Sequence, residues 1–573
     1  MLRLLSIPLA LLLLVAGAVA WSNSAAPPRA EFTLAMQRDV LSLDPSSMSY
    51  GQDIRIANGI WEGLYTNDPE TLEPIPGVAK SCDVSPDKKL YTFHLRDNAM
   101  WSNGDQVTAK DFLFAWRRML ETPGEYTYLH YYIKGAKPYL EAYQAYLADP
   151  DHAPKPDFAK SVGLESPDPL TLRVTLDNPV TFFFELAAFA PFLPLNERSM
   201  QPFAKVDPRT GHVSWDGKFT RPGVVGNGPY NMVAWEFKRR VRLEKSETYW
   251  DKEHVHTQSI EQLCVEDQLG QVLRFDSGEI DWMPEVPSEV GADMLERGRK
   301  ELHIFSGYGS YFLTLMVRPK FRDGSPNPLS DVRVRQALAM GFDRGTICKN
   351  ILRMGELPAT NYIPPGIIPD FRVDPGIDFD PKRGRELLAA SGRVVNGRLP
   401  GVTLMYRSGL FAAAAMCQNM ANQWRTNLGI DVPLEQQESK AAKDRLRNKE
   451  YAIATSNWFG DYPDPSTFTD KYLGTSENND SGWVNAEFDS LCDQATREPD
   501  KAKRYELLAR ANRMIDVELP IIPVYVLANQ YLFRDTVHGI NMSPRASTML
   551  KGIRIDHSRD AAHAKLATAQ RSR

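Results

Sequence analysis

The sequence predicts a large α/β or α+β protein with several layers, because strand-like and helix-like patterns mix along the chain without a simple βαβ rhythm. Residues 90–95 (LYTFHL) alternate apolar and polar side chains, which is typical of a half-buried strand. The segment TLRVTL (171–176) repeats this alternation after the turn-forming run SPDP. Residues 334–342 instead carry apolar side chains at every third or fourth position, as one face of a helix requires.

Two further segments extend this mixture towards the C-terminus. Residues 507–515 form a second helical stripe, and Pro520 ends that pattern. The following run PIIPVYVL (520–527) is continuously apolar and predicts a buried strand. No internal repeat is found.

The composition excludes several classes of protein. The chain has 573 residues, of which 43% are hydrophobic and 24% charged, the balance of a soluble globular protein. Its formal net charge of −5 lacks the basic excess of a typical nucleic-acid-binding protein, so we expect no nucleic-acid partner. The plentiful aromatic residues suit a large internal contact surface, although totals do not place them.

The N-terminus has the features of an export signal. Arg3 precedes the apolar stretch 4–15, and Ala18-Val19-Ala20 supplies the small residues that a signal peptidase recognises. We therefore expect residues 1–20 to be a signal peptide that sends the protein to the periplasm. The alternative is an uncleaved membrane anchor, since 4–21 is just long enough to span a bilayer. No other segment is long and apolar enough to do so, which argues against a channel or permease.

The two ends of the chain outside this signal have little predicted structure. Residues 21–30 are polar and predict a linker, and the tail 557–573 is rich in Ala, Arg, Lys and Ser, which predicts disorder. No cysteine follows the apolar stretch, so we expect no lipid anchor.

Candidate metal, redox and catalytic motifs are few. The five cysteines lie far apart and form no CxxC motif, so isolated thiols are expected, with one distant disulfide as the alternative. His254 and His256 are the only close histidine pair, and their charged surroundings favour an exposed loop over a metal site. No GxSxG or GxxxxGK[ST] motif occurs. Residues 226–229 (GNGP) predict a tight turn into a strand, because Pro229 lacks the backbone donor of a phosphate-binding loop. We therefore expect no catalytic residue, cofactor or metal.

Several segments, taken in order, resemble a known family. They are SLDP (42–45), WEGLY (61–65), PGVA (76–79), YTFHLRDNAMWSNGDQVTAKDFLFAW (91–116), GNGPYNMVAWEFKRRVRLEKSETYWD (226–251), SGEIDW (277–282), DVRVRQALAMGFDR (331–344), GELPATNYIPP (355–365), NWFGDYPDPSTF (457–468) and PIIPVYV (520–526). Together they resemble the extracytoplasmic oligopeptide- and dipeptide-binding proteins of ABC importers, solute-binding protein family 5. The resemblance runs from about residue 32 to about 555, and the segment 91–116 is its most specific mark.

The resemblance implies a two-lobed clamp of the type II periplasmic-binding-protein class with an additional α+β domain. Lobe I would combine residues 31–55, 177–307 and 531–556. The additional domain would comprise 56–176, and lobe II would comprise 308–530. In such folds the ligand binds between the lobes, which close over it by a hinge motion.

The resemblance also implies which residues bind the ligand. Asp461 matches the acidic residue that pairs with the free α-amino group of a bound peptide, because an enclosed ammonium needs a charged partner. From the sequence alone a turn acid is the alternative, since Asp464 in the same GDYPDP run suits an Asx-turn equally well. Asn457, Trp458 and Phe459 match a segment whose backbone pairs with the peptide like an added strand.

Further residues of the opposite walls follow from the same resemblance. Asp39, Val40 and Leu41 match a segment of the other lobe that lines the cleft. Four tyrosines also match cleft-lining positions, with a packed aromatic core as the equal alternative: Tyr128, Tyr131, Tyr308 and Tyr311.

One departure from the family concerns the far end of the peptide. Some members bind the C-terminal carboxylate with basic side chains of lobe II, where this sequence has Ala412 and Thr455. Arg407, Arg445 and Arg447 are near in sequence and offer a substitute. The resemblance nevertheless implies a non-enzymatic, monomeric receptor that binds short peptides and delivers them to the transmembrane subunits of an ABC permease. A non-peptide ligand, or a membrane-anchored sensor ectodomain, is the alternative.

Overall fold

The computed structural model describes residues 28–408, 412–476 and 478–557. The expected signal peptide 1–20, most of the expected linker 21–30 and nearly all of the expected tail 557–573 therefore lie outside the described residues. Within the described ranges no helix combines the length and the apolar character needed to cross a bilayer.

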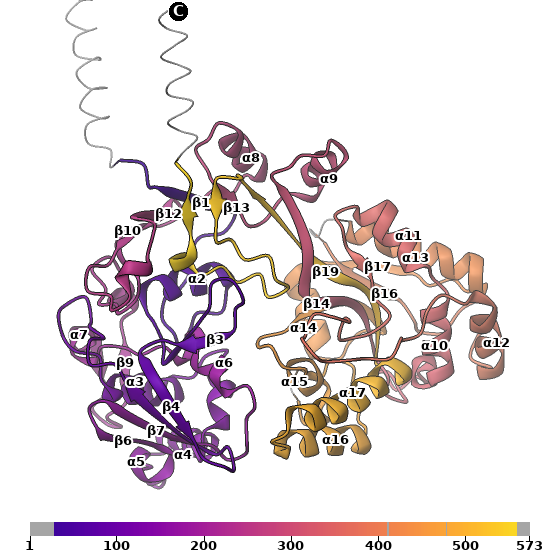
Figure 1. Cartoon of the computed structure of the whole chain (residues 1–573). Coiled ribbons are helices and arrows are strands. Elements are labelled where there is room, and N and C mark those ends of the chain that lie inside the picture. Colours follow the sequence, from indigo (N-terminus) through magenta and orange to yellow (C-terminus); the bar gives the residue numbers. More distant parts are fainter. Residues whose placement is uncertain (1–27, 409–411, 477, 558–573) are drawn as a thin grey trace, which may run out of the picture.

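One long sheet runs through the whole molecule and joins its two halves (Figure 1). Its strands, in spatial order, are β10 (Tyr230–Glu236), β11 (Arg240–Lys245), β12 (Ser259–Cys264), β1 (Phe32–Met36), β13 (Trp282–Met283), β19 (Ile521–Phe533), β14 (Leu302–Leu315), β18 (Ile453–Phe459), β16 (Leu404–Arg407) and β17 (Leu434–Gln437), with β15 (Leu357–Pro358) paired to β19. Strands from distant parts of the sequence are neighbours, and β1 pairs in parallel with both β12 and β13.

Strands β14 and β19 are the longest of the sheet and connect its two halves. Their antiparallel register shifts between Ser306 and Ser310, so the three residues 307–309 (GYG) interrupt the regular pairing. A Cβ atom at Gly309 would lie 2.1 Å from the Trp458 carbonyl oxygen, which explains the glycine at this close approach. The irregularity gives the two crossing strands a local point at which they can bend.

The half of the molecule that contains β14, β16, β17 and β18 carries helices on both faces of its sheet. Helices α10 (Val332–Met340), α12 (Pro381–Ser391) and α13 (Ala413–Leu428) cover one face, and α16 (Ala486–Arg497) and α17 (Lys501–Glu518) cover the other. Successive residues of β14 serve the two cores in turn, because Leu313 and Leu315 pack with the first group and Phe312 with the second.

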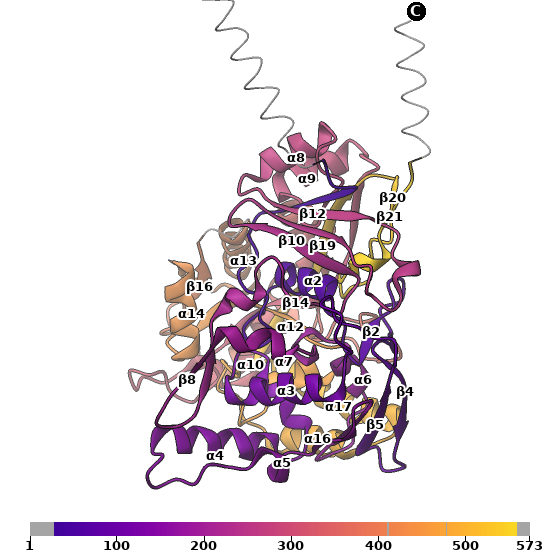
Figure 2. The same cartoon turned by 90° about the vertical axis from the view of Figure 1, so that its left-hand side faces the viewer.

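A separate four-stranded sheet lies below the large one, with helices α3 (Ala109–Glu121) and α4 (Ala136–Ala148) beside it (Figure 2). Its order is β4 (Ala79–Val84), β5 (Leu90–Leu95), β7 (Thr171–Thr175) and β6 (Leu164–Asp168). It shares one continuous hydrophobic core with the neighbouring part of the large sheet, from Phe93 to Trp282.

Shorter elements complete the described chain. They are the pairs β2 (Tyr65–Asn67) with β3 (Pro74–Pro76), β8 (Ala204–Val206) with β9 (Val213–Trp215), and β20 (Val537–His538) with β21 (Arg554–Ile555), and the helices α2 (Gly51–Ile60), α5 (Phe158–Ser161), α6 (Phe183–Ala187), α7 (Glu197–Met200), α8 (Gln268–Asp276), α9 (Ser288–Glu296), α11 (Arg344–Ile347), α14 (Ser439–Arg447) and α15 (Ser466–Thr469).

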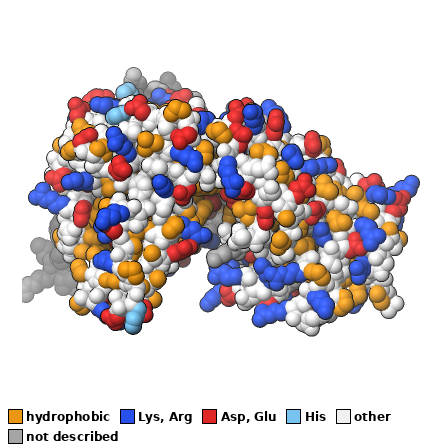
Figure 3. Space-filling view, turned by 90° about the horizontal axis from the view of Figure 1, so that it is seen from below, with side chains coloured by type: hydrophobic (Ala, Val, Ile, Leu, Met, Phe, Trp, Pro, Cys, Tyr) orange, Lys and Arg blue, Asp and Glu red, His pale blue; other side chains and the backbone are white. Residues whose placement is uncertain are grey.

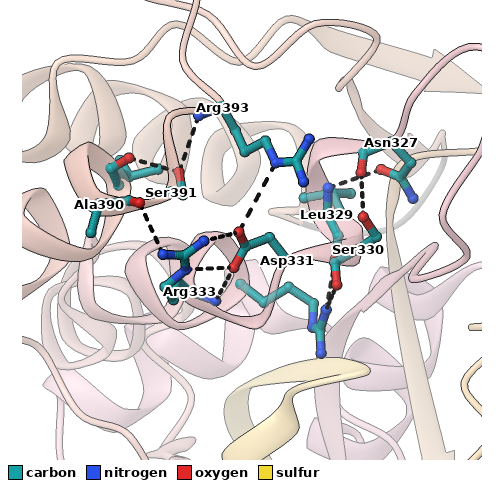
Figure 4. Close-up of polar contacts among 10 residues, drawn as sticks. Asn327, Leu329, Ser330, Asp331, Arg333, Ala390, Ser391 and Arg393 are labelled. Carbon is teal, nitrogen blue, oxygen red and sulfur yellow. Dashed lines mark hydrogen bonds and ion pairs between the residues drawn. The ribbon is translucent and has the colours of Figure 1, made fainter.

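Helix α10 illustrates how local chemistry sets an element's start (Figure 4). Asp331 caps the helix, since its side chain accepts a hydrogen bond from the backbone N–H of Arg333 at 3.0 Å. The Arg333 guanidinium returns to the same carboxylate and also donates to the Ala390 carbonyl at 2.9 Å. Arg393 approaches Asp331 at 4.0 Å. These contacts tie the start of α10 to the end of α12.

The elements predicted from periodicity are confirmed. Residues 90–95 form β5, TLRVTL forms β7, and the stripes at 334–342 and 507–515 fall in or beside α10 and on α17. The predicted strand at 520–527 is part of the longer β19, and 226–229 leads into β10 with Gly228 pressed against Ile60. His254 is exposed and hydrogen-bonded to Asp251. All five cysteines are free thiols, which excludes the alternative disulfide.

Candidate functional site

A cleft of about 830 Å³ lies between the two halves of the molecule. Figure 3, seen from below, shows the deep notch that separates the two masses. One wall comes from the end of β1 and from α2, another from residues 457–463 after and at the end of β18, and a third from the C-terminal loop 544–548. The volume lies in the range of sites that enclose small organic ligands.

Asp461 is the most unusual charged group in this cleft. Its carboxylate accepts a hydrogen bond from the Tyr128 hydroxyl at 2.8 Å, and its backbone N–H donates to the Thr467 hydroxyl at 2.9 Å. Burial raises the pKa of Asp461, and the hydrogen bond from Tyr128 offsets part of that rise. No described residue forms an ion pair with it. The carboxylate is thus held in place and has no cationic partner in the part of the chain that the structure describes.

The cleft is lined by equal numbers of basic and acidic side chains. Its walls carry three arginines, Arg38, Arg55 and Arg545, and three carboxylates, Glu185, Glu285 and Asp461. Burial raises the pKa of Glu185 to about 7, whereas burial lowers the pKa of Arg545. Separate positive and negative groups in one cleft suit a ligand that carries both charges.

The four predicted tyrosines divide into two pairs. Tyr128 reaches Asp461, and Tyr308 lines the cleft while its hydroxyl donates to the Tyr462 carbonyl at 3.1 Å. Tyr311 instead points into the core, where its ring stacks on Tyr525 at 4.8 Å. Tyr131 packs against the large core and is not among the cleft residues. For Tyr131 and Tyr311 the structure therefore favours the packed-core alternative.

Strand β18 presents the predicted segment 457–459 at the cleft. Asn457 and Phe459 line it, and Phe459 is 54% exposed, which is unusual for a large apolar side chain. The Trp458 side chain lies on the opposite face of the strand, where its indole N–H donates to the Thr467 carbonyl at 2.8 Å. Of its two neighbouring strands, β18 pairs with β14 along its whole length but with β16 only at Ile453 and Ala454. Among the residues that the structure describes, no strand pairs with the β16-side edge from Thr455 to Phe459.

The predicted residues of the opposite wall require a correction. The Asp39 carboxylate accepts hydrogen bonds from the backbone N–H groups of Val40 and Lys238, so it stabilises the β10–β11 turn. Leu41 is exposed, and its N–H is bonded to Asp53. Neither Asp39 nor Leu41 lines the cleft. The residues just before them, 36–38, do so instead, because they follow directly from the end of β1.

A second pocket of about 750 Å³ adjoins the cleft at Asn457. It contains Thr455, which stands where the resemblance places a basic side chain in some family members. Arg407 and Arg447 line the same pocket. Arg445 is not available there, because its guanidinium pairs with Glu435.

Several cleft residues were not predicted from the sequence. Arg545 and its neighbours lie in an irregular loop far along the chain, and Glu185 and Tyr126 belong to short helical or turn segments. None of them falls in a pattern of spacing or periodicity, so no signal in the sequence identifies them. Among the described residues, no group of histidine, cysteine or acidic side chains is arranged to hold a metal ion.

Comparison with known proteins agrees with this architecture. The family model described as "Bacterial extracellular solute-binding proteins, family 5 Middle" matches residues 73–480. The oligopeptide-binding protein OppA of Bacillus subtilis is 32% identical over 88% of this chain and 89% of its own, and the periplasmic oligopeptide-binding protein OppA of Escherichia coli is 30% identical over 87% and 88%. The solved structure of the murein tripeptide-binding protein MppA in its unliganded open form is 25% identical with a TM-score of 0.75, and it covers 93% of this chain and 99% of its own.

Proposed function

Because the chain belongs to the bacterial extracellular solute-binding proteins of family 5, we propose that it captures short peptides in its cleft and delivers them to an ABC permease for uptake. The similar proteins from Bacillus subtilis and Escherichia coli are named for binding oligopeptides. In this role the chain binds and releases its ligand and makes or breaks no covalent bond.

The single observation that carries the proposal is the Asp461 carboxylate. Partial burial disfavours the charged form of this carboxylate, which has no described cation, and a peptide's α-amino group supplies the missing charge together with hydrogen-bond donors. The Tyr128 hydroxyl, which belongs to the proposed additional domain, holds the carboxylate in place, so the site is organised before the ligand arrives.

The open edge of β18 supplies the second part of the site. A peptide that lies along Thr455–Phe459 completes the backbone hydrogen bonds that β16 leaves unmade. Main-chain pairing does not read side chains, so it permits ligands of varied sequence. Asn457 and Phe459 would then flank the peptide.

Closure of the clamp uses three domains, namely lobe I (31–55, 177–307 and 531–556), the additional domain (56–176) and lobe II (308–530). The irregular pairing of β14 with β19 at 307–309 supports a hinge at this crossing. Ligand binding would shift the equilibrium towards the closed form, which the permease recognises.

The same proposal covers location and assembly. Residues 1–20 act as an export signal, and the mature protein is a monomer in the periplasm. The Escherichia coli relative is named as a periplasmic protein. N-terminal sequencing of the purified protein tests this point. A mature chain that begins near Trp21 is expected, and retention of residues 1–20 would favour a membrane-anchored receptor.

Isothermal titration calorimetry with pooled di- to pentapeptides tests the peptide assignment. We expect saturable binding of at least one pool to the exported protein. Absence of heat from every pool, together with binding of a sugar or a metal chelate, would refute the assignment.

A further inference from the structure

The pocket of about 750 Å³ beside the cleft is strongly basic. Its lining contains four cationic side chains, Arg407, Lys443, Arg447 and Lys471, and among the described residues one carboxylate, Asp480. Lys471 is the buried member of this group; it pairs with Asp480 at 3.3 Å and donates to the Asn478 carbonyl at 2.6 Å. Because Asp480 is paired with Lys471, the other three cations, Arg407, Lys443 and Arg447, have no acidic partner among the described residues.

The Arg407 guanidinium is incompletely bonded. It lies at the end of β16, where β16 and β18 diverge, and its Nη2 donates to the Asn457 side chain at a long 3.4 Å. Its Nε is buried and has no hydrogen-bond partner among the described residues. A buried donor without a partner is unfavourable, and a carboxylate can accept from two guanidinium nitrogens at once.

Lys443 and Arg447 complete the basic wall from helix α14. They are four residues apart, so both side chains lie on the same face of the helix. Both are exposed, and neither forms an ion pair with a described residue. Arg445, between them in sequence, is turned to Glu435 instead. Helix α14 thus presents Lys443 and Arg447 to the pocket without a described acidic partner, whereas Arg445 is paired elsewhere.

The pocket lies along the open edge of β18. Asn457 lines both the cleft and the pocket, and four residues of chain, about 13 Å when extended, separate it from Asp461. A peptide whose α-amino group is at Asp461 therefore reaches the pocket at about its third to fifth residue. Three cations without an acidic partner among the described residues exceed the charge of one carboxylate, so a ligand with an additional negative group balances them better.

We infer that this pocket selects peptides with an acidic side chain, glutamate or aspartate, at or after the third position. This inference rests on the proposed peptide-binding function and specifies its ligand class. The acidic side chain enters between the end of β16 and α14, where Arg407, Lys443 and Arg447 bind its carboxylate.

A glutamate scan of a pentaalanine peptide tests the inference by calorimetry. Each glutamate peptide is paired with its glutamine counterpart, and both are measured as free acids and as C-terminal amides. We expect glutamate to bind about 10-fold more tightly than glutamine at one or two positions from the third onward, in both terminal forms, because hydrogen bonds to a charged carboxylate are stronger than those to a neutral amide. Added salt should reduce this ratio.

Matched variants assign the effect to the pocket. Lys443→Gln and Arg447→Gln should each lower the glutamate-to-glutamine ratio at least about 3-fold, whereas Lys382→Gln, an exposed lysine on the distant helix α12, should leave it unchanged. Thermal melting of each variant checks that the fold is retained, which is expected because all three side chains are exposed.

Three outcomes would overturn the inference. Equal binding of glutamate and glutamine peptides at every position would refute acidic selection while leaving peptide capture intact. Sensitivity to C-terminal amidation alone would assign the pocket to the terminal carboxylate only. A glutamate preference that survives both α14 substitutions would place its origin elsewhere. Absence of binding by all the peptides would instead refute the proposed function and this inference with it.

Discussion

Substitution of Asp461 by asparagine is the sharpest test of how the cleft holds its ligand. The change removes one negative charge and keeps nearly the same size and an oxygen that can accept the Tyr128 hydrogen bond. In the wild-type protein this carboxylate is half-buried, anchored by Tyr128 and without a described cation. The variant therefore removes the charge partner of the peptide's α-amino group and little else.

The expected loss can be estimated from the burial of the site. Removal of one partner of a buried, hydrogen-bonded charge pair costs roughly 2–5 kcal/mol, which is roughly a 30- to 4,000-fold weaker binding constant. Calorimetry should show this loss for a peptide with a free amine. The N-acetylated peptide has no ammonium to lose, so its affinity should change by no more than about 10-fold.

Two controls make the result specific. Glu285→Gln removes the same charge from another wall of the cleft, where the carboxylate is exposed, and should weaken binding by less than about 5-fold. The melting temperature of Asp461→Asn at neutral pH should not fall, because burial disfavours the native charged carboxylate. If the free-amine and N-acetylated peptides lose affinity equally, the pairing of Asp461 with the α-amino group is refuted.

Three further predictions concern protonation and stability. Burial raises the pKa of Asp461, and only the charged carboxylate pairs with the peptide's ammonium group. Peptide affinity, measured by calorimetry, should therefore fall as the pH is lowered, and the fall should begin at a higher pH than for an ordinary aspartate. An affinity that does not depend on pH would contradict this. Tyr128→Phe removes the hydrogen bond that lowers this pKa, so calorimetry across pH should show the acid loss moved to higher pH, and an unmoved profile would exclude the contact. Arg504→Met leaves the buried Asp464 without its partner at 2.7 Å, so urea denaturation should show a loss of about 3–5 kcal/mol, and a loss below about 1 kcal/mol would contradict the role of this ion pair.

Local elements of the fold could be predicted because their signal is local. The alternation in 90–95 and the stripes that became α10 and α17 depend only on which side chains face a core. The order of the large sheet could not be predicted from such patterns, because β1 pairs with strands more than 200 residues away, as in Leu34 with Gln262. Resemblance to a family supplied the two-lobed expectation instead.

The site residues likewise divide into those that lie in a sequence motif and those that only the folded chain brings together. Asp461 and Phe459 lie in a matched motif, and the structure places both at the cleft. Tyr308 and Tyr311 are separated by a register irregularity, so their directions follow from the local backbone and not from their spacing in sequence. Arg545 lies in a loop without regular structure, where only the folded chain brings it to the cleft.

The most direct test of the account is the crystal structure of the protein with a pentapeptide that calorimetry shows to bind. The decisive measurement is the distance between the peptide's α-amino nitrogen and the Asp461 carboxylate. We expect a charge-assisted hydrogen bond of about 2.7–2.9 Å, with the peptide backbone paired to Thr455–Phe459 of β18. A peptide bound outside this cleft, or inside it with its amino group away from Asp461, would contradict the account.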